Sequence, residues 1–189
     1  MALGATLHRL SVELTDTDRG VFRSLDLRVA QHPSETRRFL AARILGLCLL
    51  HEKGLELTPA GLSADDEPAA ALRAPDGRIL LWMDVGTPSA GRLHRASKLA
   101  RRVVVVVYDD PTALLRATAG ERIHRAEAIE VVSLPSALLD ALGDRIDRGA
   151  RWDVVHTGGH LYVTARGEAL EGAVGRTFLG EPGGPRARS

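Results

Sequence analysis

Acidic side chains occur at two places along the chain that folding could bring together. The first is the turn-like segment Ser63-Ala64-Asp65-Asp66-Glu67-Pro68, and the second is Asp84, near the end of the apolar run 79–85. Hard cations such as Mg²⁺ take oxygen ligands, and phosphate-processing sites hold them with a few carboxylates and several waters. Such an ion polarises a phosphoryl oxygen and lowers the pKa of an attacking water. Asp66, Glu67 and Asp84 are therefore candidates for a magnesium site.

A simpler explanation exists for part of this acidic set. Asp65, Asp66 and Glu67 are equally typical of a solvated turn, because acidic and small polar residues are common there. Asp84 differs from them, since a carboxylate that closes an apolar strand is costly unless it reaches solvent, a partner or a metal.

A basic helix is expected directly after this strand, over residues 89–102. It contains no acid, and positions 92, 95, 98 and 102 share one face; its basic residues are Arg92, His94, Arg95, Lys98, Arg101 and Arg102. Like charges on one face repel, so nucleic-acid phosphate or the acidic cluster would supply the counter-charge. A solvated amphipathic face is the alternative, because charged outer faces are ordinary.

Two apolar strands must position these groups. The runs 79–83 and 103–107 show no polar alternation, which is typical of strands buried on both faces at the centre of a sheet. One helix between them predicts a parallel βαβ unit. Open α/β sheets bind ligands at the carboxyl ends of such strands, where Asp84 lies.

The remaining chain predicts hairpins and helices around this unit. Loose alternation over 5–14 and 21–29 predicts an N-terminal hairpin, with Leu7, Leu10, Val12 and Leu14 on its covered face. A largely buried helix, which includes Cys48, should begin at an N-cap Ser34 and end at Lys53-Gly54, so that Glu35 complements the dipole of its first turn.

Later segments follow the same rules. Pro75-Asp76-Gly77 predicts a turn joining 71–73 to 78–85, and Gly158-Gly159 predicts a C-terminal hairpin of 152–157 with 161–165. Helices are expected at 111–117 and 136–148 and a strand at 129–134. The stretch from Gly172 is rich in Gly, Pro and Arg and should fray.

Composition limits the class of protein. A chain of 189 residues with 44% hydrophobic residues fits one globular domain, which we place at 1–180, with a flexible tail at 181–189. The net charge of +1 means that any attraction to nucleic acid must come from a local patch. One cysteine excludes an intramolecular disulfide, and no segment has the apolar length of a membrane span or a signal peptide. We expect a soluble protein of the bacterial cytoplasm, with no membrane partner.

Several segments, in order and with their spacing kept, resemble the bacterial YaeQ family, a group of uncharacterised proteins. They are the opening Met1-Ala2-Leu3-Gly4-Ala5-Thr6, then His32-Pro33-Ser34-Glu35-Thr36, the segment 61–68, and Leu81-Trp82-Met83-Asp84-Val85-Gly86 followed by Pro88 and Arg92. The resemblance covers about residues 1–180. It implies an α/β fold of the restriction endonuclease-like, or PD-(D/E)xK, type, with a mixed central β-sheet flanked by helices.

The resemblance also implies roles for individual residues. Asp66 would be the first acid of a nuclease site, with Glu67 beside it, Asp84 the acid of the (D/E)xK element, and Glu35 the helix acid that completes the metal site. Gly86 stands where an active nuclease carries lysine, so Lys98 would have to replace that lysine, while Arg92 and Arg95 would contact phosphate together with Lys98. The leading function is therefore a Mg²⁺-dependent nuclease or phosphodiesterase that acts on nucleic acid. The alternative is a non-catalytic module that binds nucleic acid or a protein partner on a degenerate nuclease fold.

Overall fold

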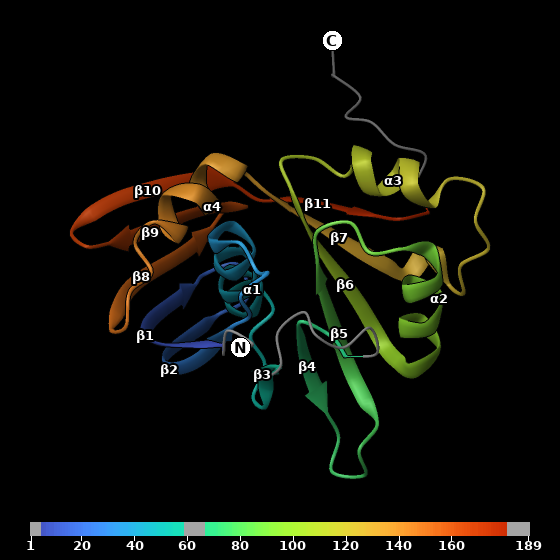
Figure 1. Ribbon diagram of the computed structural model, residues 1–189, viewed down its shortest axis with the longest axis horizontal. Helices are drawn as coiled ribbons and strands as arrows, with labels where there is room; N and C mark the ends of the chain where they lie inside the picture. The colour runs from blue at the N-terminus through green and yellow to red at the C-terminus, as the bar shows by residue number, and fades with distance from the viewer. Residues whose placement is uncertain (1–4, 59–66, 181–189) are drawn as a thin grey trace.

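The strands of the protein form two sheets, seen in a computed structural model that describes residues 5–58 and 67–180 (Figure 1). One sheet has five strands in the order β10-β9-β8-β1-β2. Its strands are β1 (Thr6–Asp16), β2 (Val21–Gln31), β8 (Ala150–Thr157), β9 (His160–Ala165) and β10 (Glu168–Ala173). The expectation of one central sheet was therefore wrong. The predicted N-terminal and C-terminal hairpins do form, but β1 pairs in parallel with β8 and so joins them into a sheet of their own.

The second sheet has six strands in the order β11-β7-β6-β5-β4-β3. Its strands are β3 (Leu55–Leu57), β4 (Ala70–Arg73), β5 (Ile79–Val85), β6 (Ala100–Tyr108), β7 (Ile129–Leu134) and β11 (Gly175–Phe178). The parallel pairing of β5 with β6 and the β4–β5 hairpin confirm the predictions for this region. The mixed α/β character of the chain is thus confirmed, with two mixed sheets in place of one.

Both faces of the six-stranded sheet are covered, as the unbroken apolar runs predict. Val104 and Val106 of β6 point into a core that this sheet shares with the five-stranded sheet, whereas Val103, Val105 and Val107 point into a second core on the opposite face. Helix α1 (Arg37–Leu49) supplies much of the shared core and lies between the two sheets (Figure 1). Helix α2 (Ala90–Leu99) and helix α3 (Thr112–Thr118) contribute Leu93 and Leu114 to the second core.

The five-stranded sheet buries one face only. Its side chains alternate, so that Leu10, Val12 and Leu14 of β1 are buried and their neighbours face outward. Leu7 lies one residue out of this alternation and is 53% exposed, while His8 takes the buried place. The prediction of Leu7 as a covered residue was therefore wrong, because side chains of a strand change face at every residue.

Three boundaries differ from their predictions. Helix α1 begins at Arg37, because the hydroxyl of Thr36, and not that of Ser34, accepts a hydrogen bond from the Phe39 amide. It also ends at Leu49, before Lys53-Gly54. Helix α4 (Ser136–Gly143) is shorter than the predicted 136–148.

The C-terminal region is ordered further than expected. The stretch from Gly172 was predicted to fray, but β10 ends at Ala173 and β11 pairs with β7 through Phe178. The predicted tail 181–189 lies outside the described residues. In the part of the chain that is described, no helix is long and apolar enough to cross a bilayer.

Candidate functional site

Asp84 lies near the carboxyl end of β5, as predicted, and is only 3% exposed. Arg92 reaches back to it from the first turn of α2, which Ser89 caps. Its Nε lies 2.8 Å from one carboxylate oxygen of Asp84, and its Nη2 lies 2.7 Å from the other. Such a bidentate contact engages both carboxylate oxygens of Asp84 and neutralises its buried charge.

Among the described residues, Arg92 also contacts the segment before β4 and the ring of Trp82. Its Nη2 donates to the carbonyl oxygen of Glu67 at 2.6 Å, and its guanidinium lies 5.5 Å from the centre of the Trp82 ring, within cation–π range. Arg92 was predicted to contact phosphate. That contact stays a prediction; in this structure Arg92 joins β5, α2 and the segment that leads into β4, and its side chain is 23% exposed.

Glu35, the third predicted metal ligand, lies before α1 and is also buried. Nη1 of Arg43 lies 2.8 Å from one of its carboxylate oxygens, and the other oxygen accepts from the His32 amide at 3.0 Å. Both side chains of this ion pair are at most 1% exposed. The expectation of a surface acid that complements the dipole of the first helical turn was therefore wrong, because Glu35 precedes the helix and pairs inside the core.

The two arginines also hold the chain on either side of residues 59–66. Arg43 donates to the carbonyl of Thr58 at 2.9 Å, and Arg92 donates to that of Glu67. Thr58 in turn donates to the carbonyls of Ala69 and Pro68. Asp65 and Asp66, for which a metal site was predicted, lie outside the described residues. Within 5–58 and 67–180, no group of three or more His, Cys, Asp or Glu side chains is placed to hold a metal ion.

Gly86 follows Asp84 by two residues, at the position of the lysine in the implied nuclease motif. Its φ of +86° falls in the left-handed region, and its amide donates to the carbonyl of Val106 at 2.8 Å. An L-residue is strained in that conformation, so the backbone here favours glycine over lysine.

The basic helix is shorter than predicted. It ends at Leu99, and Arg101 and Arg102 lie on β6. Arg102 forms ion pairs with Glu52 and Glu130. The predicted row of four cations on one helical face is therefore wrong, since Arg102 has left the helix and Arg92 turns to Asp84.

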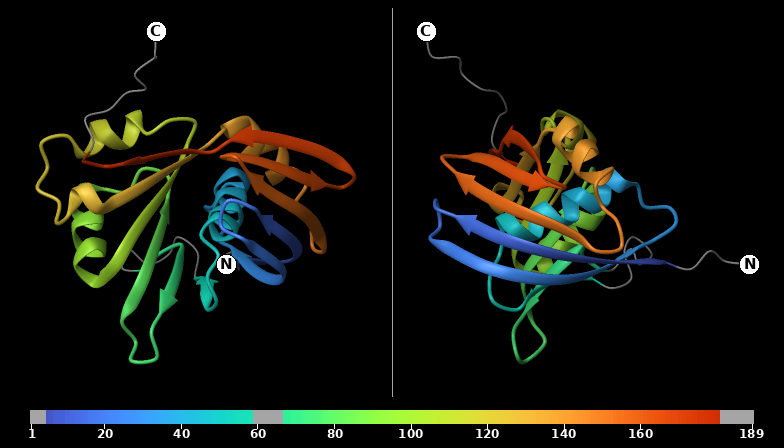
Figure 2. Two further views of the ribbon diagram at one scale, coloured as in Figure 1. Left: turned by 180° about the vertical axis from the view of Figure 1, so that it is seen from behind. Right: turned by 90° about the vertical axis from the view of Figure 1, so that its left-hand side faces the viewer.

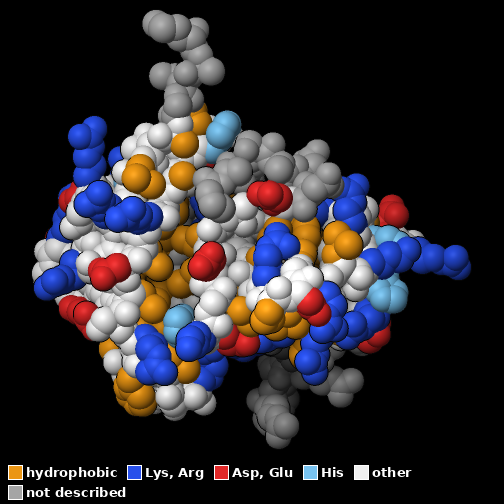
Figure 3. All heavy atoms as spheres, turned by 90° about the horizontal axis from the view of Figure 1, so that it is seen from below, with side chains coloured by type: hydrophobic (Ala, Val, Ile, Leu, Met, Phe, Trp, Pro, Cys, Tyr) orange, Lys and Arg blue, Asp and Glu red, His pale blue; other side chains and the backbone are white. Residues whose placement is uncertain are grey.

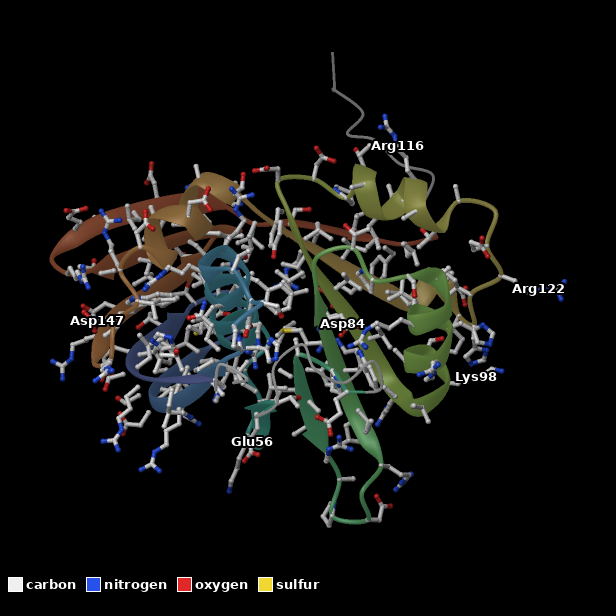
Figure 4. The ribbon with its side chains drawn as sticks, in the orientation of Figure 1. Glu56, Asp84, Lys98, Arg116, Arg122 and Asp147 are labelled. Carbon is white, nitrogen blue, oxygen red and sulfur yellow. The ribbon has the colours of Figure 1, made fainter. Side chains whose placement is uncertain are left out.

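Cationic side chains nevertheless gather around the outer side of α2. The exposed ones on α2 and on the neighbouring segments are Arg95, Lys98, Arg101, Arg122 and Arg125, which we call the α2 basic surface. Nδ1 of His94 lies 3.1 Å from the carbonyl of Arg122, which places residue 122 beside the helix. Figure 3 shows blue side chains at the right-hand end of the molecule. In Figure 4, Lys98 and Arg122 are labelled at this end, and Asp84 is labelled inside the molecule.

Sequence reasoning did not assign partners to the two buried acids. Arg43 is the only charged residue between Phe39 and Leu50, and a lone charge in an apolar helix is a signal for a buried partner. Trp82 and Arg92 offered no comparable signal, because their contact depends on how α2 folds back over β5.

Comparison with known proteins places the chain in a family. The sequence profile described as "YaeQ protein" matches residues 1–174. The "Uncharacterized protein YaeQ" of Escherichia coli (strain K12) is 37% identical over 113 residues, which are 60% of this chain, and the one of Salmonella typhi has the same identity over the same length. The aligned region spans 62% of the length of these curated relatives.

Two solved structures are similar along most of the chain. The YaeQ protein from Xanthomonas axonopodis pv. citri superposes with a TM-score of 0.81 at 33% identity, over 90% of this chain and 96% of that one. The YaeQ protein from Pseudomonas syringae gives 0.80 at 29% identity, over 95% of this chain and 98% of that one. The match along most of the sequence and the similarity of the folds lead to one conclusion: this chain belongs to the YaeQ family.

Proposed function

We propose that this protein is a non-catalytic module that binds nucleic acid through the α2 basic surface, on a scaffold that resembles the restriction endonuclease-like fold. The observation that carries the proposal is the bidentate Arg92–Asp84 pair. It occupies the acid of the implied (D/E)xK element with an internal cation. The left-handed backbone of Gly86, where the catalytic lysine would stand, supports the same conclusion.

The α2 basic surface supports nucleic acid as the partner. Arg95 and Lys98 were predicted to contact phosphate, and the fold places Arg101, Arg122 and Arg125 on exposed positions of neighbouring segments. Phosphate contacts of Lys and Arg release counterions, so such binding weakens steeply as salt is raised. A protein partner held mainly by apolar contacts would show little of this salt dependence.

The test is the salt dependence of binding to fluorescently labelled single-stranded DNA, duplex DNA and RNA, read by anisotropy. Lys98→Ala with Arg101→Ala should weaken binding and reduce the slope of log K against log salt by roughly 1.5 to 2, about one unit for each lost contact. Lys53→Ala with Arg73→Ala is the matched control, because it removes the same charge from exposed positions before β3 and at the end of β4. Equal losses in both pairs would contradict a specific surface.

A Mg²⁺-dependent nuclease is the second candidate, and the place of Asp84 at the carboxyl end of β5 favours it. In that case Asp66, Glu67, Asp84 and Glu35 would hold or surround the ion and Lys98 would act in catalysis. Arg92 would have to release Asp84 when the metal and the substrate phosphate bind.

Calorimetric titration of Mg²⁺ and Mn²⁺ separates the two functions. The nuclease requires metal binding that is lost in Asp84→Asn, together with metal-dependent cleavage that the same substitution abolishes. Asp76→Asn, in the exposed turn before β5, is the control for the lost charge. Nucleic-acid binding that persists in Asp84→Asn, without cleavage by the wild-type protein, supports the non-catalytic module.

A further inference from the structure

A small hollow lies within the α2 basic surface, at the amino ends of β6 and β7, and holds about 10 Å³. Arg101 at the start of β6 and Arg125 in the loop before β7 both line it, with the buried side chains of Val103 and Ile129. Figures 1 and 2 show this loop, between α3 and β7, beside the end of α2. The volume admits about one water-sized group, such as one oxygen of a phosphate.

The hollow carries positive charge without a matching acid. Among the described residues, no acid lines it, and the guanidinium groups of Arg101 and Arg125 form no ion pair or hydrogen bond. The hydroxyl of Ser97, also in the lining, donates to the carbonyl of His94 at 3.0 Å. The free donors of the hollow therefore belong to the two arginines, each of which has five N–H groups.

The surroundings keep this excess of positive charge. Across residues 93–101 and 119–128 the chain has two acids, Glu121 and Glu127, against the five cations of the α2 basic surface. Glu130 of β7 points to the opposite face of the sheet, where two other arginines engage it. An anion at the hollow is thus attracted by more cations than there are acids to repel it.

The backbone of Arg125 has an unusual conformation. Its φ of +49° lies in the left-handed region, where an L-residue is strained and glycine is not. Strained positions of this kind cluster at ligand-binding sites and switch regions. The strain at Arg125 is a second observation, independent of charge, that points to the hollow.

The residue types of this surface favour a duplex over a single strand. Proteins that hold single strands stack successive bases on aromatic side chains. Residues 89–102 and 119–128 contain no Phe, Tyr or Trp. The exposed Phe178 of β11 lies opposite Glu130, so it shares the face of the sheet away from α2. A duplex presents its phosphates on the outside, and cations alone can hold them.

We propose that the α2 basic surface binds double-stranded nucleic acid through its sugar-phosphate backbone, with one phosphate seated between Arg101 and Arg125. Guanidinium groups match a phosphate through paired N–H donors. Lys98 and Arg122, labelled in Figure 4, contact neighbouring phosphates. This partner rests on the nucleic-acid binding proposed above and specifies its strandedness.

The seated phosphate lies far from Asp84. Strands β5 and β6 are parallel, and Ala100, next to Arg101, lies opposite Ile79. Asp84 follows Ile79 by five residues, which span about 16 Å at 3.3 Å per residue. A duplex held at the hollow therefore does not present that phosphate to Asp84, in agreement with a non-catalytic role.

The experiment compares a short labelled duplex of mixed sequence, as DNA and as RNA, with its separate strands. Anisotropy with the full chain at one salt concentration gives the affinities. A duplex should bind at least about tenfold more tightly than either of its strands. Single strands that bind as tightly as the duplexes would overturn duplex binding and leave the nucleic-acid binding proposed above intact. Absence of binding to every form would overturn both.

Arg125→Gly tests the phosphate seat, because glycine accepts the φ of residue 125 while the guanidinium is removed. The variant should weaken duplex binding by about threefold to tenfold and lower the slope of log K against log salt by about one. Arg101→Gln should have the same effects. Since both arginines hold one phosphate, the double variant should lose less affinity than the product of the two single losses.

Arg151→Gln is the matched control, because Arg151 is exposed on β8, in the sheet that lies away from α2 (Figure 2). Its duplex affinity and salt slope should equal those of the wild type. If Arg125→Gly does not fold by circular dichroism, Arg101→Gln decides. Unchanged affinity in the folded variant, single losses that multiply fully in the double variant, or an equal loss in Arg151→Gln would each overturn the phosphate seat.

Discussion

Two buried carboxylates with arginine partners decide how the predicted acidic site is interpreted. Glu35 pairs with Arg43, and Asp84 pairs with Arg92, in each case an arginine eight residues further along the chain. Each acid lies ahead of a helix and each arginine lies on it. Glu35 and Asp84, which the sequence suggested as metal ligands, are thus each neutralised by an arginine of the same chain. These ion pairs contribute to the stability of the fold.

Breaking the deeper of these pairs should cost much stability. Glu35→Ala leaves the guanidinium of Arg43 buried without its counter-charge, so we expect the free energy of unfolding to fall by about 3 to 5 kcal/mol. Asp140→Ala breaks the Arg38–Asp140 pair, in which both side chains are at least 40% exposed, and should cost less than about 1 kcal/mol. Urea denaturation measures both, and similar losses would mean that the Glu35–Arg43 pair contributes no more than a surface contact.

Asp16 should make the protein sensitive to acid. Burial would raise its pKa, but the hydrogen bonds and charges of Arg19 and His156 outweigh burial and lower it. Because the pKa of Asp16 is lower in the folded state, its ionised carboxylate stabilises the fold. This contribution is fully present above the unfolded-state pKa of about 3.9, and it is lost as the pH falls through the lower pKa of the folded state.

The stability difference between wild type and Asp16→Asn should therefore shrink as pH is lowered from 5 through about 4 and below. Urea denaturation at a series of pH values measures this difference. A difference that stays constant below pH 4 would show that the carboxylate of Asp16 does not titrate with folding. Asp76→Asn, at an exposed turn, should show little pH-dependent difference.

At the scale of elements, the sequence predicts best where one local pattern dominates. The apolar runs of β5 and β6 and the glycine turns of the hairpins stand out without tertiary information. The end of α2 could not be located this way, because Arg101 and Arg102 fit a helical face as well as an exposed strand start. These residues form the start of β6 because they pair in parallel with β5, where Ala100 lies opposite Ile79 and Arg102 opposite Leu81.

The acids of the candidate site could be predicted from the sequence, but their arginine partners could not. Asp84 at the end of an apolar strand follows from the order of residues alone. Its contact with Arg92 requires α2 to fold back over β5, and the pairing of β1 with β8 joins segments about 140 residues apart. Side-chain contacts at such distances have no signature in a single sequence.

Gly86→Lys tests the turn that follows β5. At φ +86° an L-residue costs about 1 to 2 kcal/mol, so the variant should be less stable by that amount and should gain no metal-dependent cleavage. Gly91→Ala is the control, because a Cβ there meets no atom within 4 Å and alanine favours the helix by up to about 1 kcal/mol. Thermal denaturation and a cleavage assay compare the variants. If the Gly86→Lys protein is as stable as wild type, the backbone at residue 86 does not strain an L-residue.

At the scale of the whole molecule, the two sheets share one core. Leu10 and Trp152 from the five-stranded sheet and Met83 and Val106 from the six-stranded sheet belong to the same buried cluster as α1. Gly46 shows how closely they pack, since a Cβ there would lie 2.7 Å from Sδ of Met83. Such continuity favours the prediction that residues 1–180 unfold as one unit.

The two tryptophans of the chain test this, because Trp82 lies in the six-stranded sheet and Trp152 in the five-stranded sheet. In Trp82→Phe and in Trp152→Phe, the fluorescence of the remaining tryptophan should lose its native signal at the same urea concentration as the circular dichroism. Neither indole N–H has an acceptor among the described residues, so phenylalanine loses no hydrogen bond there. Two different midpoints within one variant would show that the sheets unfold separately.

The parallel pairing of β1 with β8 also limits when β1 can find its neighbour during synthesis on the ribosome. The first strand of the protein lies between β2 and β8, and β8 begins at Ala150, so β1 must wait for most of the chain to be translated before that neighbour exists. The strands β3 to β7 are consecutive in the sequence and become available earlier. Only when Val174 has been added can the chain pass from β10 into β11 and complete the other sheet. The nascent N-terminal hairpin therefore spends translation with one edge unpaired, which is the period when a chaperone would protect it.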